Sequence, residues 1–492
     1  MKKTESICPE CLKKIDAKVV QKNGKVELTK KCEEHGTFTA THWQSPKIYE
    51  FAEKFDLFNR VNIAAKHDDP NNCPHACGLC SHHLSKTVIA VIDLTKKCDL
   101  FCPICFASFP QHTSSYEPDK QEIFKMLTFL SQLDPKPPAV LFSGGEPLLR
   151  DDLDEIIRFA DERGFLSILA TNGIRMARQK DLAFKLKRSG LNIVYLQFDG
   201  LDNEVYEKLR GERFLEEKLK VIEVCRKYDI EVILVPTLIR GMNDKHVGSI
   251  IRFAAENSDI VRGVVFQPIA FTGRATDNPF LNEWTDNTFA EEVEMQTSGE
   301  IKAEDLFPLS IMTPPIMVMR RFMKKPWPLF SCSPHCGIVN WVYVSKDGHL
   351  IPLNRLLDFE KFFEALLKLS ESVESKGKPQ ILLTLFLAAL KSLNWSLVRR
   401  EIGLLNFFKT VLKVHVSPTY KSLGNLRRRI FLLGCMAFMD RYNFDVNRVR
   451  RCVIHYVTPD LNIIPFCAYN NVYRTQIEAE YAKKPIKVRV KR

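Results

Sequence analysis

The sequence lacks long hydrophobic runs, and its first residues do not follow the pattern of a signal peptide. No stretch stays apolar over the roughly 18–20 residues that a membrane-spanning helix needs. Residues Met1–Glu5 are mostly polar or charged, whereas a signal peptide carries an apolar core. We therefore expect a cytoplasmic protein. It could still bind peripherally to the inner face of the membrane.

The chain also lacks internal repeats of the solenoid type. Its length of 492 residues is enough for two to four domains. The formal net charge is +12. Basic proteins often bind nucleic acid or anionic lipid, but a solvated basic surface explains this charge equally well. Charge alone therefore does not decide the function, and we expect no nucleic acid among the partners.

Cysteine, by contrast, is abundant, with 15 residues. Disulfides are rare in a reducing cytoplasm, so metal binding explains this number better. Disulfide cysteines scatter along a chain, whereas these occur in groups; only Cys225 stands alone, and it is expected to be a core residue. The groups are Cys8/Cys11/Cys32, Cys73/Cys77/Cys80, Cys98/Cys102/Cys105, Cys332/Cys336 and Cys435/Cys452/Cys467.

Strand-like and helix-like patterns alternate in the middle of the chain. This alternation predicts an α/β fold with a parallel sheet and right-handed crossovers, whose active site lies at the carboxyl ends of the strands. The predicted strands are Val88–Leu94, Val140–Phe142, Leu166–Ala170, Ile193–Phe198, Val232–Pro236 and Val264–Pro268. The predicted helices are Gln121–Leu133, Leu153–Arg163, Asp181–Ser189, Leu215–Tyr228 and Val247–Asn257.

Two motifs follow the first two predicted strands. Cys98, Cys102 and Cys105 form a CxxxCxxC loop, whose three thiolates can hold three irons of a cubane and leave the fourth open. A zinc knuckle or a structural cluster is the alternative. Ser143-Gly144-Gly145-Glu146-Pro147 follows the second strand. Its glycines let the backbone approach a ligand closely, and Glu146 can pair with an ammonium group.

With both motifs on successive strand ends, the sequence resembles the radical S-adenosylmethionine (SAM) superfamily. The resemblance implies a partial (β/α)6 barrel and a 4Fe-4S cluster, held by Cys98, Cys102 and Cys105, that passes one electron to SAM. The products are methionine and a 5′-deoxyadenosyl radical, which removes hydrogen from unactivated carbon. The resemblance also implies further cofactor-binding residues, namely Phe106, Gly144, Gly145, Glu146, Asn172 and Asp199. Of these, Asn172 and Asp199 could equally be turn residues.

The remaining cysteine groups predict additional metal centres. Cys73, Cys77 and Cys80 repeat the CxxxCxxC spacing without a following glycine motif, which fits an auxiliary 4Fe-4S cluster. A second auxiliary cluster would take four thiolates from the C-terminal half, and the fifth would complete the first one. Those five cysteines are Cys332, Cys336, Cys435, Cys452 and Cys467. Some of them could also be buried and unligated.

The N-terminal residues show a CxxC…CxxH pattern that predicts one tetrahedral metal site. Its ligands would be Cys8, Cys11, Cys32 and His35. Zinc fits this donor set best, and a rubredoxin-like iron is the alternative.

Within the superfamily, the sequence resembles over nearly its full length the group that contains archaeal tetraether lipid synthase. Members of that group are also described as pterin methyltransferases. The resemblance implies three 4Fe-4S clusters, one mononuclear iron and a reductant such as ferredoxin. It rests on the knuckle, the Cys73 group and the strings at 195–200, 266–268, 272–274, 455–459 and 464–470.

The expected function is therefore a radical SAM oxidoreductase of archaeal membrane lipid biosynthesis that joins carbon atoms of isoprenoid lipid chains. One feature independent of the resemblance favours it: Phe359–Phe438 is rich in Leu and Phe, and it could enclose alkyl chains or lie on anionic lipid. An ordinary helical core with a solvated basic face explains the composition of this segment equally well, and the basic tail 487–492 would belong to the same solvated surface. A pterin methyltransferase is the second hypothesis, and an iron–sulfur electron carrier without SAM chemistry is the third.

Five segments are expected along the chain. They are a metal knuckle at 1–45, an auxiliary cluster segment at 46–84, the radical SAM barrel at 85–275, an irregular linker at 276–340, and a helical substrate and auxiliary cluster region at 341–492.

Overall fold

The computed structural model describes residues 2–43, 45–56, 72–78, 83–107, 117–277, 286–323, 327–372, 376–404 and 426–482. Three elements of the sequence analysis lie outside these ranges, namely Cys80, the segment 405–425 and the tail 487–492.

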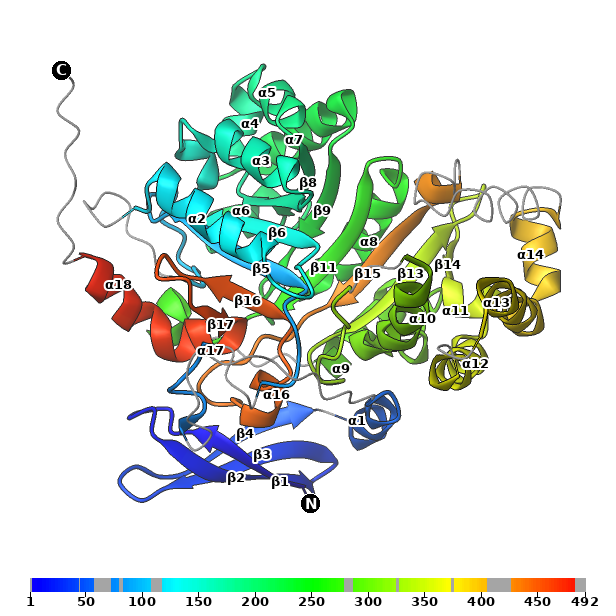
Figure 1. The fold of residues 1–492 in the computed structure, drawn as a ribbon, viewed down its shortest axis with the longest axis horizontal. Helices are drawn as coiled ribbons and strands as arrows, with labels where there is room; N and C mark the ends of the chain where they lie inside the picture. Colours follow the sequence, from blue (N-terminus) through cyan, green and yellow to red (C-terminus); the bar gives the residue numbers. More distant parts are fainter. Residues whose placement is uncertain are drawn as a thin grey trace.

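The N-terminal knuckle is a four-stranded antiparallel sheet in the order β1-β2-β3-β4, the blue element in Figure 1. Val26, Leu28 and Lys30 are buried on β3 while the residues between them are not, the period-two pattern of a strand with one covered face. The elements are β1 (Lys2–Ile7), β2 (Lys14–Lys22), β3 (Lys25–Cys32), β4 (Gly36–Trp43) and the following helix α1 (Pro46–Glu53).

The middle of the chain forms the predicted parallel sheet. All six predicted strands are confirmed and lie side by side in sequence order. They are β5 (Ile89–Thr95), β6 (Ala139–Gly144), β7 (Leu166–Thr171), β8 (Leu191–Gln197), β9 (Glu231–Val235) and β11 (Val261–Pro268), with the short β10 (Thr237–Leu238) beside β11.

Helices cover the outer face of this sheet (Figure 1), and their apolar sides share one core with the strands. Five of them match the predicted helices closely. The sequence analysis missed α4 and α6, because five and eight residues are too few for a clear helical period. The helices are α2 (Lys120–Ser131), α3 (Leu153–Glu162), α4 (Ile174–Arg178), α5 (Leu182–Arg188), α6 (Asn203–Arg210), α7 (Leu215–Tyr228) and α8 (Val247–Glu256).

The C-terminal half extends this sheet at both edges, which the sequence analysis did not predict. Strand β15 pairs in parallel with β11 at one edge, and β16 pairs in parallel with β5 at the other. Short apolar runs cannot be assigned to strand or helix by periodicity, and these strands have only three to seven residues. The added strands are β13 (Ile338–Val344), β14 (Leu350–Pro352), β15 (Ile430–Cys435), β16 (Ile454–Val457) and β17 (Ile463–Pro465), with β12 (Phe307–Pro308) at the far edge.

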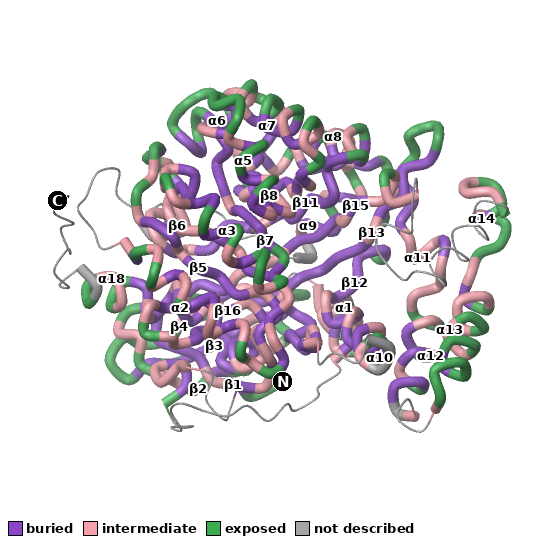
Figure 2. Tube along the Cα trace, turned by 45° about the horizontal axis from the view of Figure 1, so that its top comes forward, coloured by how far each residue is buried: buried purple, intermediate pink, exposed green. Residues whose placement is uncertain are grey.

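Helices of the C-terminal half lie around these strands. Those after residue 341 were expected, whereas α9 and α10 fall in the segment 276–340, which was expected to be irregular. Helices α12 to α14 form a layer at the edge of the molecule, and much of α13 is exposed in Figure 2. Across the ranges given above, no helix has the length and apolar character to cross a membrane. The helices are α9 (Asp286–Gln296), α10 (Thr313–Met323), α11 (Leu353–Leu356), α12 (Phe359–Glu371), α13 (Lys378–Ser392), α14 (Trp395–Glu401), α16 (Val446–Val449), α17 (Phe466–Ala468) and α18 (Arg474–Ala482).

Candidate active site

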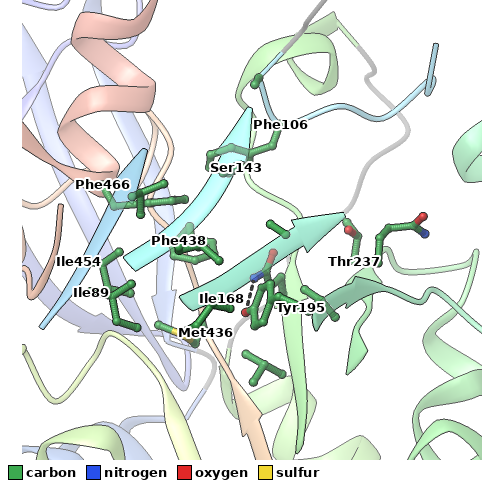
Figure 3. A pocket seen from close by; sticks show the side chains of 18 of the residues that line it. Ile89, Phe106, Ser143, Ile168, Tyr195, Thr237, Met436, Phe438, Ile454 and Phe466 are labelled. Atoms are coloured by element: carbon green, nitrogen blue, oxygen red, sulfur yellow. Dashed lines mark hydrogen bonds between the residues drawn. The ribbon is translucent and has the colours of Figure 1, made fainter. Parts of the chain in front are cut away.

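A cavity of about 480 Å³ lies inside the curved sheet, and Figure 3 shows its walls. Alternate residues of each strand line it; on β5 these are Ile89, Val91 and Asp93. The residues near the amino ends of the strands are mostly aliphatic, and polar side chains gather toward the carboxyl ends. The walls come from the central parallel strands and from β13, β15 and β16 together, so both halves of the chain build the site.

The three cysteines of the CxxxCxxC motif lie where the sequence analysis predicted them. The loop after β5 carries Cys98, Cys102 and Cys105, and all three line the cavity at the carboxyl ends of the strands. Phe106 also lines the cavity, and its ring centroid lies 5.6 Å from that of Phe466. A soft donor set on one side of an open cavity fits a cluster that leaves room for a second ligand.

Gly144 and Gly145 are required by the backbone of the cysteine loop. A Cβ atom on Gly144 would lie 2.3 Å from the Thr95 carbonyl oxygen, and one on Gly145 would lie 2.1 Å from that of Lys97. Gly144 also has a φ of +124°, a conformation that glycine adopts readily. The Gly145 N–H donates to Thr95 O at 2.7 Å. The two motifs are therefore held together by main-chain contacts.

Glu146 is buried and joins the loops that follow β6 and β7. Its carboxylate accepts hydrogen bonds from Thr171 Oγ1 at 2.6 Å, from the Asn172 N–H at 2.8 Å and from the Leu148 N–H at 3.0 Å. Burial raises the pKa of Glu146 to about 7. Glu146 therefore links two loops of the protein, and it also lines the cavity. Its contact with the ammonium group of SAM stays a prediction.

Asn172 connects the same network to the cysteine loop. Its Nδ2 donates to Asp99 Oδ1 at 2.7 Å, and its Oδ1 accepts from the Ile174 N–H at 2.9 Å. Asp99 directly follows Cys98. Asn172 therefore positions the cluster loop, and it also lines the cavity, as its predicted cofactor contact requires.

Asp199 has a different environment from the one expected for a cofactor-binding residue. It is fully buried and absent from the cavity wall, and Arg210 donates to both of its oxygens, at 2.7 and 2.8 Å. The Thr237 N–H also donates to Asp199, at 3.0 Å, and so does Gln197 Nε2. Arg210 also donates to Ile104 O, inside the cysteine loop, at 3.0 Å. The bidentate pair thus makes Asp199 a positioning residue that acts through Arg210, which does line the cavity.

Gly273 and Arg274, which follow β11, hold the cysteine loop by contacts with its main chain. The Arg274 N–H donates to Cys105 O at 3.0 Å, and its Nε donates to Cys102 O at 2.9 Å. A Cβ atom on Gly273 would lie 2.3 Å from Cys105 O. In the sequence, residues 272–274 stand out only because they contribute to the family resemblance. Nothing in their spacing predicts that they pack on the cysteine loop.

The N-terminal metal site is formed as predicted. The ligand atoms of Cys8, Cys11, Cys32 and His35 all lie within 4.8 Å of one another. Bonds of about 2.0–2.3 Å from a tetrahedral zinc to sulfur and nitrogen fit such a spacing. A hydrogen bond from His35 is the main cause that lowers the pKa of Cys32 to about 6, which favours the thiolate that a metal needs.

Sequence comparison decides the family. The chain is 40% identical over 489 residues to a 7,8-dihydro-6-hydroxymethylpterin dimethyltransferase of Methanocaldococcus jannaschii, covering 98% of this chain and 96% of that protein. Residues 92–254 match the radical SAM superfamily. The chain belongs to the radical SAM superfamily. Residues 1–44 match the HMPTM N-terminal zinc ribbon domain, in agreement with the metal site described above.

Two further matches cover a smaller part of the chain. A probable GTP 3',8-cyclase of Thermococcus kodakarensis is 31% identical over 171 residues, 35% of this chain and 54% of that protein. The structure of Streptococcus suis SuiB bound to S-adenosylmethionine aligns with a TM-score of 0.37 and 17% identity, covering 44% of this chain and 48% of that one. SAM and a 4Fe-4S cluster are the cofactors of this radical SAM protein, and the ribbon provides a further metal site.

Four of the five C-terminal cysteines of this radical SAM protein lie close to one another. Burial raises the pKa of the Cys332 and Cys452 thiols, and the nearby Cys336 thiol adds to the rise in both. Burial also raises the pKa of Cys467 to about 11, again with a contribution from Cys336. Cys435 instead packs in the main core of the sheet. The expectation that the fifth cysteine completes the cluster of Cys73, Cys77 and Cys80 stays a prediction, which the iron content of a Cys435 variant tests.

The helices predicted to enclose alkyl chains do not reach the cavity. No described residue of α11 to α14 lines it. These helices pack on each other and on α10 and the sheet edge, while Leu383 of α13 is 58% exposed. The end of the same predicted segment, Phe359–Phe438, does reach the cavity, because it forms β15 and carries Leu432, Gly434, Met436 and Phe438 on the wall. Enclosure of alkyl chains by helices α12 to α14 is therefore not supported by the described residues, and peripheral membrane contact stays a prediction.

Proposed function

We propose that this protein is a radical SAM methyltransferase whose substrate is a reduced pterin. The observation that carries the proposal is the 40% identity to a pterin dimethyltransferase over 98% of this chain. The match includes the zinc ribbon at residues 1–44, because it extends over nearly the whole chain. The second of the three hypotheses drawn from the sequence is thus favoured over the first.

The cluster loop and the glycine motif form the SAM site in this proposal. Cys98, Cys102 and Cys105 hold the cluster, Gly144 to Glu146 and Asn172 frame the methionine end of SAM, and Phe106 packs beside it. A 4Fe-4S cluster held there would supply the electron that splits the carbon–sulfur bond of SAM, giving methionine and a 5′-deoxyadenosyl radical that removes hydrogen from the pterin. A second SAM molecule, with one more electron from the reductant, would supply the methyl group and leave as S-adenosylhomocysteine. The aliphatic barrel walls exclude water from that radical.

Two auxiliary clusters complete the proposed equipment. Cys332, Cys336, Cys452 and Cys467 supply the four thiolates of one. Cys73, Cys77 and Cys80 belong to the other. In the described part of that group, Tyr473 fixes the loop, because its hydroxyl donates to Pro74 O and accepts from the Cys77 N–H, both at 2.7 Å. Cys467 packs in the same apolar cluster as Cys73 and Cys77, so the two groups adjoin.

Carbon coupling of isoprenoid lipids is the rival function, and it receives less support. The aliphatic cavity walls suit an alkyl chain, but the leucine-rich helices that first favoured lipid lie away from the cavity. An electron carrier without SAM chemistry is disfavoured by membership of the superfamily. A reductant is needed in either case, and a ferredoxin-type carrier is the expected partner.

One anaerobic assay separates the candidates. Reconstituted enzyme is incubated with SAM and dithionite, and with either a reduced pterin or an archaeal diether lipid. We expect 5′-deoxyadenosine to rise with the pterin and mass spectrometry to find a methylated pterin. Coupled lipid without methylated pterin would refute the proposal.

The same assay tests the cluster ligands. Replacing Cys98, Cys102 or Cys105 with Ala should abolish 5′-deoxyadenosine formation, because three thiolates must hold the reducing cluster. Cys225→Ala is the matched control, since Cys225 is a buried core cysteine whose sulfur lies 4.0 Å from that of Met176. A wild-type yield from any one of the three variants would remove that cysteine from the ligand set.

A further inference from the structure

A buried carboxylate–guanidinium pair forms part of the cavity wall. Asp93, on β5, and Arg474, the first residue of α18, both line the cavity. Arg474 Nη1 lies 3.0 Å from Asp93 Oδ2. The side chain of Arg474 is 8% exposed and that of Asp93 is 18% exposed. Neither residue belongs to the cysteine motif or to the glycine motif, and the sequence analysis singled out neither.

Arg474 is fixed by several neighbours. Its Nε donates to Asn470 Oδ1 at 2.9 Å, and its Nη2 donates to Tyr456 OH at 3.1 Å. Its guanidinium also lies over the rings of Tyr456 and Tyr469, at 5.3 and 4.9 Å from their centroids. These contacts hold the guanidinium plane in one orientation at the cavity wall.

Asp93 is less well satisfied. Within the described part of the chain, its Oδ1 is buried and accepts no hydrogen bond. A buried carboxylate oxygen without a donor is costly, and burial raises the pKa of Asp93 although Arg474 and Lys96 lower it. Glu146, the other described carboxylate on the cavity wall, already accepts three hydrogen bonds. Asp93 therefore has acceptor capacity to offer a ligand, and rotation about its broad χ2 torsion can bring either oxygen to the cavity.

The neighbourhood of this pair suits a flat ring. Tyr456 and Phe466 stack with centroids 5.3 Å apart, and Phe438 and Phe466 stack at 4.5 Å. All three line the cavity, and Figure 3 shows Phe438 and Phe466 near each other on one wall. Aromatic faces of this kind bind planar ligands by offset or edge-to-face packing.

The register of the sheet places the pair beside the SAM site. Asp93 is the direct cross-strand neighbour of Ser143, the first residue of the glycine motif, and Val91 is the neighbour of Tyr456. A ligand held by Asp93 would thus lie between the aromatic wall and the SAM-binding strand end. That is where a substrate must lie to react with a radical formed from SAM.

We propose that Asp93 and Arg474 recognise the amino- and oxo-substituted edge of a planar heterocycle, with the aromatic wall holding its face. This inference rests on the proposed function, in which the substrate is a reduced pterin. The 2-amino group and the adjacent ring N–H of a pterin are two parallel donors, which match the two acceptors of a carboxylate. The neighbouring ring carbonyl is an acceptor, which matches a guanidinium N–H.

Two ring systems test this recognition directly. Anaerobic calorimetry with SAM present would compare 6-hydroxymethyl-7,8-dihydropterin with 6-hydroxymethyl-7,8-dihydrolumazine, in which an oxo group replaces the 2-amino group. We expect the wild-type protein to bind the pterin at least about tenfold more tightly, because the oxo group turns a donor into an acceptor that faces Asp93. Asp93→Asn should reduce this preference to about threefold or less.

Glu478→Gln is the matched control variant. Glu478 also contacts Arg474 Nη1, at 3.3 Å, but it does not line the main cavity. It should therefore keep the wild-type preference for the pterin. Equal binding of both rings by the wild type would overturn the role of Asp93, and so would an Asp93→Asn variant that weakens both rings by the same factor. No binding of either ring by the wild type would overturn the proposed function as well.

Discussion

At the scale of single residues, the site is held together by close main-chain contacts that only small side chains permit. The glycine motif approaches the backbone of residues 95–97 so closely that a methyl group on either glycine would overlap a carbonyl oxygen. The ion pair of Asp199 and Arg210 holds the cysteine loop from another side. Thus several residues of these motifs position the cysteine loop, and Asp199 does so without lining the cavity.

Gly145→Ala tests this positioning role. The new Cβ would lie 2.1 Å from Lys97 O, so the cluster loop must shift, and overpacking of this kind costs about 1–3 kcal/mol or more. We expect lost cluster iron and weaker SAM binding. Gly299→Ala is the control, because nothing lies within 4 Å of its Cβ and only its φ of +75° is unfavourable. If both variants kept equal iron and equal SAM affinity, the close approach would be irrelevant to the site.

Lys218 is a buried cation beneath the SAM site. Its Nζ donates to Gln197 Oε1 at 2.7 Å and to Asn172 O at 2.5 Å, and burial lowers its pKa to about 8. Since an unfolded lysine titrates near 10.5, the unfolded state binds more protons between about pH 8 and 10.5. The contribution of Lys218 to the free energy of unfolding therefore rises with pH in this window.

Lys218→Met should remove that rise. Anaerobic urea unfolding at pH 8 and pH 10 would measure the change, which is at most about 1.4 kcal/mol per pH unit. Lys220→Met, on the exposed face of the same helix, should keep the wild-type pH dependence. The same slope in both variants would show that Lys218 does not titrate in this window.

At the scale of elements, the ribbon β1–β4 is a metal-binding unit docked on the rest of the chain. Lys30 of β3 donates to Arg441 O at 2.7 Å, and Thr4 of β1 donates to Asp445 Oδ1 at 2.7 Å. These contacts join the ribbon to the segment that carries α16. The ribbon and that segment are more than 400 residues apart in the sequence, yet buried hydrogen bonds connect them.

His35→Ala should release the ribbon metal and leave the cluster iron unchanged. The four ligands form one tetrahedral set, and a set of three binds much more weakly. Elemental analysis of the purified protein would measure one equivalent of zinc or iron lost. His349→Ala is the control, because the His349 side chain is exposed and its ring is paired with Glu300, far from the ribbon cysteines in sequence. An unchanged metal content in the His35 variant would refute the site.

At the scale of the whole molecule, one sheet runs through both halves of the chain. The proposed barrel at 85–275 supplies its centre, and β13, β15 and β16 of the later segments supply its edges and part of the cavity wall. Three of the five segments expected from the sequence, 85–275, 276–340 and 341–492, therefore share one sheet, and the last of them completes the active site, whereas the ribbon forms a sheet of its own.

Iron content tests the proposed set of clusters. Three 4Fe-4S clusters hold about twelve irons, and Cys452→Ala should lose about four of them. Cys435→Ala should keep all of them, because Cys435 packs in the main core. Wild-type protein with about four irons would exclude both auxiliary clusters, and loss from the Cys435 variant alone would move the assignment to that cysteine.

The sequence by itself determined the parallel sheet, the cysteine loop at its carboxyl end and the ribbon metal site. These are local patterns, since the spacing of Cys98 to Cys105 and the alternation of strands and helices can be read within a few dozen residues. Only the tertiary structure decided how the rest contributes. Asp93 and Arg474 are 381 residues apart, and Arg210 and Arg274 contact a loop more than 100 residues before them. Contacts of that range depend on which strands become neighbours in the sheet, and no local period in the sequence records it.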